Sequence, residues 1–446
     1  MTQPAYTLSA TEAAKAMALA RLTSVELVTS CLARITETDS AIQAWAHLDA
    51  EAALAQAAEC DRLRKAGMPT GPLHGIPVGL KDIIDTVDMP TQRGTDIFAG
   101  RQTDSDARLV ECLREAGAVI MGKTVTTELA FVHANATRNP HNADHSPGGS
   151  SSGSAAAVAA HHVPLAVGTQ TNGSVIRPAS FCGTFGFKPT RGVISRTGVL
   201  QTSASLDQVG CFGRTLEDVA LLADVLGCYD QRDVCSYARA RPDMMHGATE
   251  DAPVDPDFAW LDLPFYGRLT VDAREGVEDV LDLLGPKVTR MTPADTLSNL
   301  VAVQARIHEY EIAQHQAEVF DTHWDQISDT LKPVITRARQ ITKTEYDDAL
   351  EVKRSAEAFF ADFFTEFDAI LAPAAAGEAP KYGDGTGDPI FCTLWTLAGL
   401  PCVTLPLLVG ETGLPIGVQV IGPVERDDRL LRTARWLQTH LAEAAA

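Results

Sequence analysis

The sequence lacks the marks of an exported or membrane-spanning protein. No stretch of about 18 uncharged apolar residues is present, which argues against a membrane-spanning helix. The run 155–167 comes closest, but His161, His162 and Pro164 interrupt it. Residues 1–20 contain no basic segment followed by an apolar run, so we expect no signal peptide. These absences favour a cytoplasmic protein.

The cysteines give no sign of a disulfide framework or a metal site. The sequence has nine of them, widely spaced and without a C-x-x-C pair. Disulfide scaffolds and zinc ribbons need paired cysteines at short, regular spacings. We therefore expect a reducing compartment, and we expect no metal.

Basic residues are scarce relative to acidic ones. The chain of 446 residues has 37 Lys and Arg against 58 Asp and Glu, which gives a formal net charge of −21 at pH 7. Such an acidic surface repels phosphate backbones and anionic lipids, so we expect neither nucleic acid nor a membrane as a partner. A wholly disordered chain is excluded too, because 45% of the residues are hydrophobic and 21% are charged.

Predicted helices and strands alternate along the chain, which is typical of an α/β fold. Helical patterns cover 7–66, including a run from 41 to 65 that is rich in Ala, Glu and Arg. The short apolar run 76–80, bounded by Gly and Pro, predicts a buried strand. Further helices are predicted at 104–117, 154–160, 215–227, most of 270–365 and from 427, and further strands at 118–121, 163–167, 367–372, 402–408 and 417–421.

The domain organisation follows from the absence of dividing segments. We find no internal repeat and no long linker, and the polar loop 229–258 is the only candidate boundary. The helical block after that loop and the strands near the end suggest one sheet that receives strands from both halves of the chain. We therefore predict a single large domain.

A run of serine and glycine, Gly148 to Ser154, is the first segment with chemical potential. The helix-forming residues 155–160 follow it, so the run lies where a buried helix begins and not in a flexible linker. No G-x-x-x-x-G-K-[ST] motif supports phosphate binding. Residues 149–153 match the G-x-S-x-G nucleophile elbow of an α/β-hydrolase-type esterase, although 141–147 do not resemble the strand that this motif requires. The esterase remains an alternative.

The turn Thr171-Asn172-Gly173-Ser174 follows a predicted strand. It could be an ordinary β-turn, since Asn-Gly is a common turn pair. Alternatively, its backbone N–H groups face Ser174. Asn172 and Gly173 both tolerate a positive φ, which lets successive amides converge on one point, as an oxyanion hole requires.

Lys81 comes at the end of the predicted strand 76–80. Its amine could simply extend from the strand end into water. If the amine is buried instead, its pKa falls and it can act as a base. Both interpretations stay open on the sequence alone.

Together these segments resemble the amidase signature family. The family pattern has a lysine at the end of a strand, then G-G-S-S-G-G-S before an Ala-rich helix. A segment of the type G-[ST]-D-T-G-G-S-I-R-x-P-A then runs into C-G-x-x-G-x-K-P-[ST]. The corresponding pieces here are Lys81, Gly148–Ser154, Gly168–Ala179 and Cys182–Thr190. The resemblance covers most of the chain, and residues 230–360 are least recognisable.

The resemblance implies roles for individual residues. Ser174 would be the nucleophile, Ser150 a bridging serine with a cis peptide bond, and Lys81 the base. Backbone N–H groups of the turn 171–174 would bind the oxyanion. The resemblance implies no cofactor.

Two further residues, Ser151 and Arg177, would bind the substrate. Arg177 would meet a substrate carboxylate, or it would instead tie loops together. The chain departs from the family pattern at Gln170, Asn172 and Ser152, where many relatives have Asp, Gly and Gly. Gln170 is similar to a subgroup that includes malonamidase-like enzymes.

The fold implied by the resemblance is one α/β domain, 1–446, with a central mixed sheet of many strands flanked by helices. Along the chain it would comprise N-terminal helices, a catalytic core, a variable helical segment on the substrate side, and C-terminal strands with a helix, at 7–66, 67–228, 229–366 and 367–446.

The function implied is that of a cytoplasmic, cofactor-free amidase. It would hydrolyse a small-molecule carboxamide, urea or carbamate, and a homodimer stays open. The alternative is the amidase subunit of a glutamine-dependent amidotransferase, which would work with partner subunits. Residues that select the substrate are expected between 230 and 390, with Tyr310, Cys392 and Trp395 as candidates for the pocket.

Overall fold

The computed structural model describes residues 3–293 and 296–444. The predicted domain 1–446 therefore extends past the described residues at both ends. Residues 294–295, which belong to the predicted helical segment 270–365, also lie outside the described residues.

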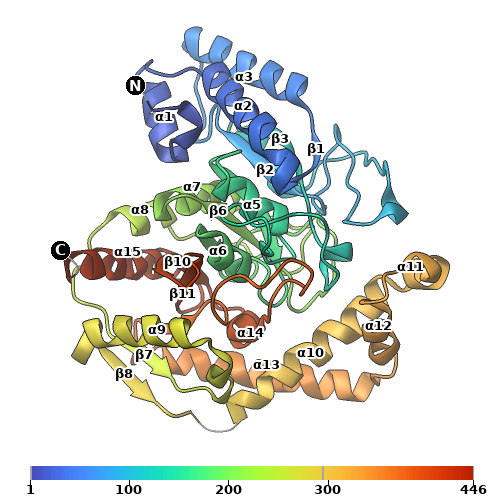
Figure 1. Ribbon diagram of the computed structural model, residues 1–446, viewed down its shortest axis with the longest axis vertical. Coiled ribbons are helices and arrows are strands. Elements are labelled where there is room, and N and C mark those ends of the chain that lie inside the picture. The colour runs from blue at the N-terminus through green and yellow to red at the C-terminus, as the bar shows by residue number, and fades with distance from the viewer. Residues whose placement is uncertain (1–2, 294–295, 445–446) are drawn as a thin grey trace.

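One mixed sheet of eleven strands forms the centre of the described chain (Figure 1). The pairs β3–β2–β4 and β8–β7–β9 are parallel, and the other pairs are antiparallel. β5 pairs with β10, so strands from both halves of the chain meet in the middle of the sheet, which confirms the predicted α/β fold. The spatial order is β1 (Trp45–Leu48), β3 (Val119–Thr124), β2 (Pro77–Lys81), β4 (Leu165–Gln170), β6 (Gln208–Gly213), β5 (Phe185–Lys188), β10 (Cys402–Val409), β11 (Pro415–Ile421), β9 (Ala369–Pro373), β7 (Phe258–Leu261) and β8 (Val288–Met291).

Helices cover both faces of this sheet. A side chain at Gly210 of β6 would meet Val175 beside α6, whereas one at Gly213 would meet Asp218 and Val219 of α7. Side chains alternate between the two faces of a strand, so α6 and α7 lie on opposite faces. The described helices are α1 (Ala10–Ala18), α2 (Ser24–Ile42), α3 (Ala50–Lys65), α4 (Arg108–Glu115), α5 (Ser152–Ala159), α6 (Ile176–Cys182), α7 (Leu216–Leu226), α8 (Met244–Thr249), α9 (Val271–Leu284), α10 (Thr296–His315), α11 (Ala317–Thr322), α12 (Lys332–Ala338), α13 (Lys343–Phe363), α14 (Ile390–Leu397) and α15 (Asp427–Ala444).

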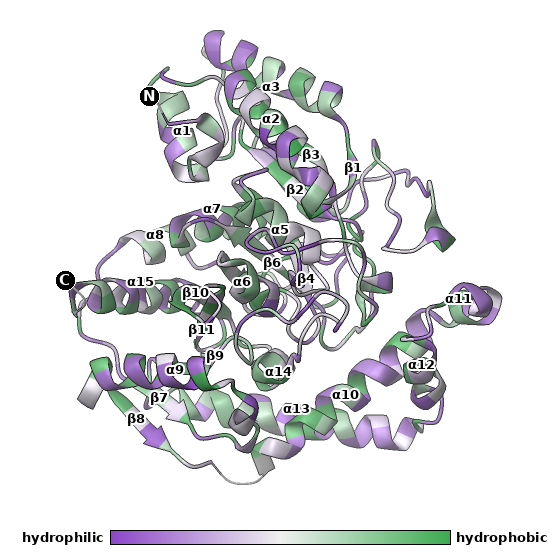
Figure 2. Cartoon of the chain, in the orientation of Figure 1, coloured by the Kyte–Doolittle hydropathy of each residue, from purple (hydrophilic) through white to green (hydrophobic). Residues whose placement is uncertain are grey.

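The helices differ in how deeply they are buried. Every residue of α5 from Ser152 to Val158 is buried, and its small side chains let it pack close to β2, β3 and β4. By contrast, α10 and α13 alternate apolar and polar residues and lie at the opposite end of the molecule from α2 and α3 (Figure 2). None of the helices in the described residues combines the length and apolar character needed to cross a membrane.

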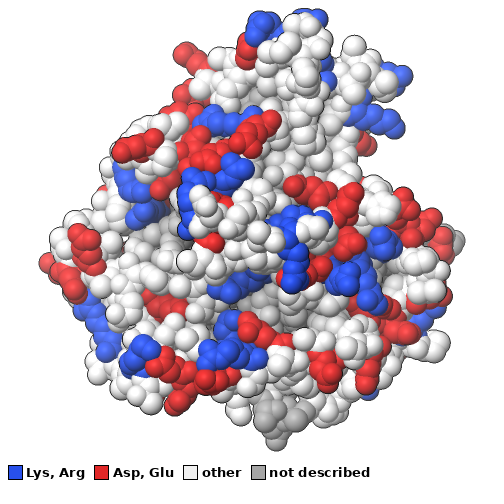
Figure 3. Space-filling model, turned by 180° about the vertical axis from the view of Figure 1, so that it is seen from behind, with Lys and Arg blue, Asp and Glu red and all other residues white. Residues whose placement is uncertain are grey.

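Charged side chains of both signs are interspersed on the face seen in Figure 3. Several of the charged residues form exposed ion pairs, such as Arg290 with Glu278 at 2.5 Å and Arg337 with Glu309 at 2.5 Å. Isolated surface pairs of this kind contribute about 0–1 kcal/mol each. The acidic excess of the sequence is therefore spread among basic groups on this face.

The prediction of one helical run from 41 to 65 is wrong. α2 ends at Ile42, because Gln43 adopts a left-handed conformation (φ 56°) and Asp39 accepts a hydrogen bond from the N–H of Ala44. The chain then forms β1, and Asp49 caps α3 by accepting from the N–H of Ala52. Helix-forming composition hid this turn chemistry, which depends on two aspartates.

Other elements were also absent from the predictions. The predicted loop 229–258 contains α8, and the predicted helical segment 270–365 is interrupted by β8. β5, β6, β7, α6 and α14 were not predicted either. These five elements are short and fully buried, so their sequences carry no alternation between a buried and an exposed face.

Candidate active site

Lys81 is the last residue of β2, a strand that is paired on both sides. Its side chain is buried, and its Nζ donates to Ser150 Oγ at 2.7 Å and to Thr169 Oγ1 at 2.8 Å. Burial lowers the pKa of Lys81 to about 7, although the carboxylate of Asp207 opposes this fall. Of the two alternatives for Lys81, the structure therefore shows the buried amine, which is partly neutral near pH 7.

Ser150 lies in the loop that leads into α5. The Gly149–Ser150 peptide bond is cis, the isomer that the family resemblance implies. In the described chain, no strand lies between the end of β3 at Thr124 and the start of α5 at Ser152. The nucleophile-elbow interpretation of residues 149–153 is therefore wrong, because an elbow needs a strand directly before its serine.

The residues Thr171–Ser174, called the nucleophile loop below, connect β4 to α6. Gln170 shapes this loop from its start. Its Oε1 accepts from the N–H groups of Val175 at 2.8 Å and Ile176 at 3.0 Å, and its Nε2 donates to Thr396 Oγ1 at 2.9 Å. One side chain thus satisfies amides at the start of α6, which would otherwise lack partners, and joins the loop to α14.

The backbone amides of the nucleophile loop are unoccupied. Within the described residues, none of the four N–H groups from Thr171 to Ser174 donates a hydrogen bond to the protein. Consecutive free amides beside a serine can bind a developing oxyanion. The left-handed backbone that we predicted for Asn172 and Gly173 is wrong, since neither residue has a positive φ.

Ser174 itself is free to react. It is 9% exposed, and its hydroxyl has no hydrogen-bond partner within the described residues. No hydrogen bond joins it to Ser150 there, so the structure shows the Lys81–Ser150 contact but no direct Ser150–Ser174 contact. Ser174 lines a pocket of about 240 Å³, called the nucleophile pocket below.

The nucleophile pocket is formed by segments that are far apart in the sequence. The nucleophile loop and Arg177 form its inner wall, and residues of α10 and α12 form its outer wall. The lining residues are Ala130, Phe131, Val132, Thr171, Asn172, Gly173, Ser174, Arg177, Gln304, Ala305, His308, Glu309, Val334, Arg337, Thr386, Gly387 and Pro389.

The guanidinium of Arg177 braces the loops on which the two serines lie. It donates to the carbonyl oxygens of Gly149 at 2.6 Å and Gly387 at 2.8 Å and to Thr386 Oγ1 at 3.2 Å. Within the described residues no carboxylate pairs with Arg177, and its buried Nε has no acceptor. Arg177 therefore ties loops together, one of its two anticipated roles, and also brings a positive charge to the pocket.

The other predicted binding residues lie less openly. The Ser151 hydroxyl is fully buried, and it both donates to and accepts from the backbone of Thr169. Tyr310, Cys392 and Trp395 are not among the residues that line the nucleophile pocket. Tyr310 stacks on Tyr346 instead, and Cys392 and Trp395 are buried on α14.

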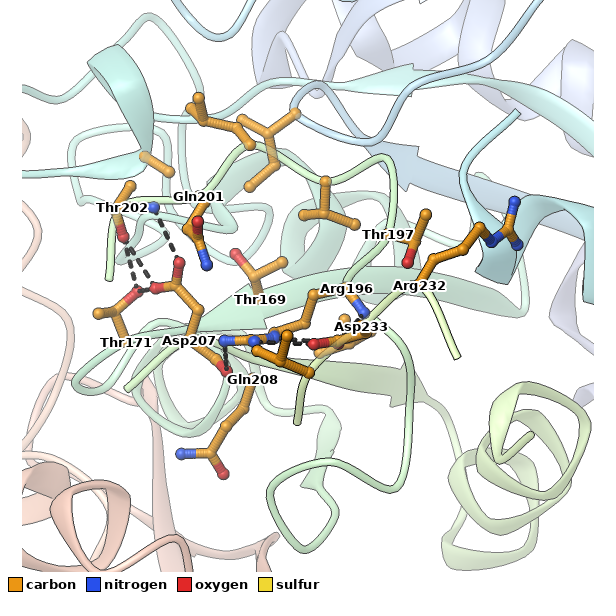
Figure 4. Close-up of a pocket in the computed structure, with 16 residues that line it drawn as sticks. Thr169, Thr171, Arg196, Thr197, Gln201, Thr202, Asp207, Gln208, Arg232 and Asp233 are labelled. Atoms are coloured by element: carbon orange, nitrogen blue, oxygen red, sulfur yellow. Dashed lines mark hydrogen bonds and ion pairs between the residues drawn. The ribbon is translucent and has the colours of Figure 1, made fainter. Parts of the chain in front are cut away.

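A second cavity of about 280 Å³ lies on the other side of Thr171 (Figure 4). There Asp207 accepts hydrogen bonds from the hydroxyls of Thr171 at 2.6 Å and Thr202 at 2.8 Å. Arg196 and Asp233 form a buried ion pair in the same cavity. Burial raises the pKa of Asp207, yet its hydrogen bonds favour the ionised form, so this carboxylate is well placed to steady the nucleophile loop.

Sequence reasoning missed Gln304, His308 and Asp207. The first two are ordinary polar residues on a long amphipathic helix, and no local motif marks them. Asp207 belongs to a segment that resembles the family, but its contact with Thr171 depends on the folding of the sheet. Within the described residues, no group of three or more His, Cys, Asp or Glu is arranged to hold a metal.

The geometry can be compared with known proteins. A family model described as Amidase matches residues 26–431. The chain belongs to the amidase signature family. It is accordingly a hydrolase that acts on C–N bonds, and the buried Lys81–Ser150 pair lies where that family's signature segments meet.

Relatives and solved structures agree with this assignment. The glutamyl-tRNA(Gln) amidotransferase subunit of Chloroflexus aurantiacus is 34% identical over 474 residues, which cover 95% of each chain. The structure of 6-aminohexanoate cyclic dimer hydrolase complexed with substrate has a TM-score of 0.87 and 26% identity, and covers 100% of this chain and 99% of that one. A structure concerned with a vestigial protein complex and the origins of an s-triazine catabolic enzyme has a TM-score of 0.91, with 28% identity over 97% of this chain and 98% of that one.

Proposed function

We propose that this amidase hydrolyses a small carboxamide, urea or carbamate through an acyl-enzyme on Ser174. The observation that carries the proposal is the buried Lys81 amine, which contacts Ser150 at 2.7 Å and has a pKa of about 7. A neutral amine in this place can accept a proton at physiological pH. The unoccupied amides of the nucleophile loop supply the other requirement, a site for negative charge.

The reaction proceeds in two halves. Neutral Lys81 takes the proton of Ser150 while Ser150 takes that of Ser174, and the Ser174 oxygen attacks the substrate carbonyl carbon. The loop amides hold the oxyanion. When the C–N bond breaks, Ser150 passes a proton to the leaving amine and regains one from Lys81. Water then adds to the acyl-enzyme by the same relay, which releases the acid and restores Ser174.

Arg177 and Ser151 take supporting parts in this proposal. The positive charge of Arg177 lies beside the site where the oxyanion forms, and it favours substrates and intermediates with negative charge near that wall. Ser151 is held by the backbone of Thr169 on both sides of its hydroxyl, which supports a role in placing Ser150 against β4. Any effect of Ser151 on substrate binding would then be indirect.

An amidotransferase component is a second candidate, and the Chloroflexus relative named above supports it. The chain differs from the usual pattern of that component at Gln170 and Asn172, and its net charge of −21 disfavours direct contact with tRNA. Size-exclusion chromatography of the natively expressed protein separates the two candidates. A partner chain, together with turnover of glutamine alone, would favour the amidotransferase, whereas a monomer or homodimer that hydrolyses other amides would favour the amidase.

The direct test is an ammonia- or amine-release screen of the wild-type protein and Ser174→Ala. The panel holds short aliphatic amides, aryl amides, glutamine, ureas and carbamates. We expect the variant to lose about 10⁴-fold or more in kcat/KM, because the nucleophile is removed. Intact-mass spectrometry of quenched wild-type reactions should show the acyl adduct, and Ser355→Ala on the exposed face of α13 is the control. Undiminished turnover by Ser174→Ala would rule out the proposal.

A further inference from the structure

His308 is the polar side chain of the outer wall that has no partner. It lies on α10 and lines the nucleophile pocket together with Ser174. Within the described residues neither ring nitrogen makes a hydrogen bond, and Nε2 is buried. Its ring packs edge-on against Phe131, with the two ring centres 4.5 Å apart. The imidazole is thus held in place by an aromatic contact, and its polar atoms remain free.

An unpaired buried nitrogen is costly. Leaving one unsatisfied costs about 1–3 kcal/mol, and native proteins seldom do so without a reason. The neighbouring polar groups of the pocket are occupied: Gln304 bonds to Asn172 and Thr171, and Glu309 pairs with Arg337. The free group is therefore the one that a bound molecule would satisfy.

The structure fixes His308 relative to the nucleophile loop. Gln304, one helical turn before it, donates to the carbonyl oxygen of Thr171 at 3.1 Å and accepts from Asn172 Nδ2 at 3.1 Å. Asn172 is held in turn by the hydroxyl of Thr393 at 2.8 Å. Residues four apart lie on the same face of a helix about 6 Å apart along its axis, so the anchor at Gln304 places His308 within the length of a small substrate.

We propose that His308 selects substrates whose acyl part carries a second, neutral amide-type group, a carboxamide or ureido function. Burial lowers the pKa of His308 to about 3, so the ring is uncharged at physiological pH. A neutral imidazole offers one N–H donor and one acceptor, and an amide offers the complementary pair. An alkyl group would leave both nitrogens unpaired, and a carboxylate would have no donor for the acceptor nitrogen. The inference rests on the proposed amidase function.

Three compounds of similar shape test the selection: succinamide, 4-methylpentanamide and succinamate. They place a carboxamide, an isopropyl group or a carboxylate at the far end of the same acyl chain. We expect the wild-type kcat/KM for succinamide to exceed that for 4-methylpentanamide by at least about tenfold. His308→Phe should lower the succinamide value by about 10–100-fold and change the 4-methylpentanamide value less than about threefold.

Conservative and control variants separate selection from structural damage. His308→Gln keeps a donor and an acceptor, so it should retain a preference for succinamide that His308→Phe loses. His315→Phe, at the exposed end of the same helix, should leave the ratio unchanged. Equal losses on succinamide and 4-methylpentanamide in His308→Phe would overturn the proposal, and so would a wild-type preference for succinamate.

Binding to an inactive protein keeps this test independent of the mechanism. Ser174→Ala protein is titrated with the same three compounds by calorimetry. Succinamide should bind more tightly than 4-methylpentanamide, and the difference should vanish when His308→Phe is added. Equal or undetectable binding of all three compounds would refute the role of His308. Retained turnover by Ser174→Ala would refute the nucleophile instead.

Discussion

The two walls of the nucleophile pocket are built on opposite principles. On the inner wall, buried contacts hold Gln170, Thr171 and Arg177 to strands and loops from across the molecule. On the outer wall, α10 and α12 present an unpaired imidazole and a solvent-facing ion pair on helices with polar outer faces (Figure 2). The inner wall is rigid because each side chain is over-determined, whereas the outer wall can change residues without disturbing the sheet.

This contrast separates chemistry from selection. The residues that would move protons lie on strand ends and helix starts, where the backbone is fixed by pairing on both sides. The residues that would read the substrate lie in the segment 229–366, which is also the least recognisable part of the sequence. The predictions below probe whether the two walls are as independent as their construction indicates.

Replacing the buried amine should have the largest effect. We expect Lys81→Met to lower kcat/KM by about 10³-fold or more, because the relay loses its base. The same change should raise the free energy of unfolding by about 1–3 kcal/mol at pH 7, since it removes the cost of burying an amine. Lys123→Met on the adjacent strand β3, also a buried lysine with a lowered pKa, is the matched control and should stay active. Chemical denaturation and steady-state kinetics measure both effects.

The direction with pH follows from the pKa of Lys81. In the folded protein it is about 7 and in the unfolded chain about 10.5. The stability gain of Lys81→Met should therefore be full below pH 7 and shrink as the pH rises toward 10.5.

The rate should depend on the same proton. Because only the neutral amine can act as a base, kcat/KM should fall about tenfold per pH unit below pH 7 and level off above it. The profile is measured between pH 5 and 9 on the wild type and on Lys123→Met, which should give the same curve. A flat wild-type profile would mean that Lys81 is not the group that accepts the proton.

Loosening the inner wall should cost less. Gln170→Ala removes the acceptor for the N–H groups of Val175 and Ile176 and the donor to Thr396. We expect kcat to fall about 10–100-fold with little change in KM, because the loop amides lose their alignment with the oxyanion. Gln419→Ala, which removes a buried glutamine of β11, controls for general loss of stability. A change in KM alone would place Gln170 in substrate binding.

The smallest effect is expected at the rim of the outer wall. Glu309→Gln breaks an ion pair with Arg337, whose side chain is 60% exposed. Exposed pairs contribute at most about 1 kcal/mol, so KM should change less than about threefold and kcat should be unaffected. A loss above about tenfold would show that the rim takes part in orienting the substrate, and the two walls would then be less independent than we argue.

Much of the inner wall could be predicted from sequence, and little of the outer wall. Lys81, Ser150 and Ser174 lie in short segments whose residue types are tied to local backbone requirements. The pairing of Thr171 with Asp207 joins residues 36 apart, and that of Gln304 with the loop joins residues 133 apart. Only the folded chain determines such contacts. The same applies to β5 and β10, whose pairing no local pattern encodes.

The contact between Gln170 and Thr396 has a consequence for how the enzyme is made. The two residues are 226 positions apart, and β10, which flanks β5 in the sheet, also comes from the end of the chain. A ribosome adds about 5–20 residues per second, so roughly 10–45 s separate the synthesis of the nucleophile from that of its brace. During that interval the nascent chain carries the relay residues without an aligned oxyanion site. Activity should therefore appear only when the chain is nearly complete, which protects the cell's amides from a half-made hydrolase.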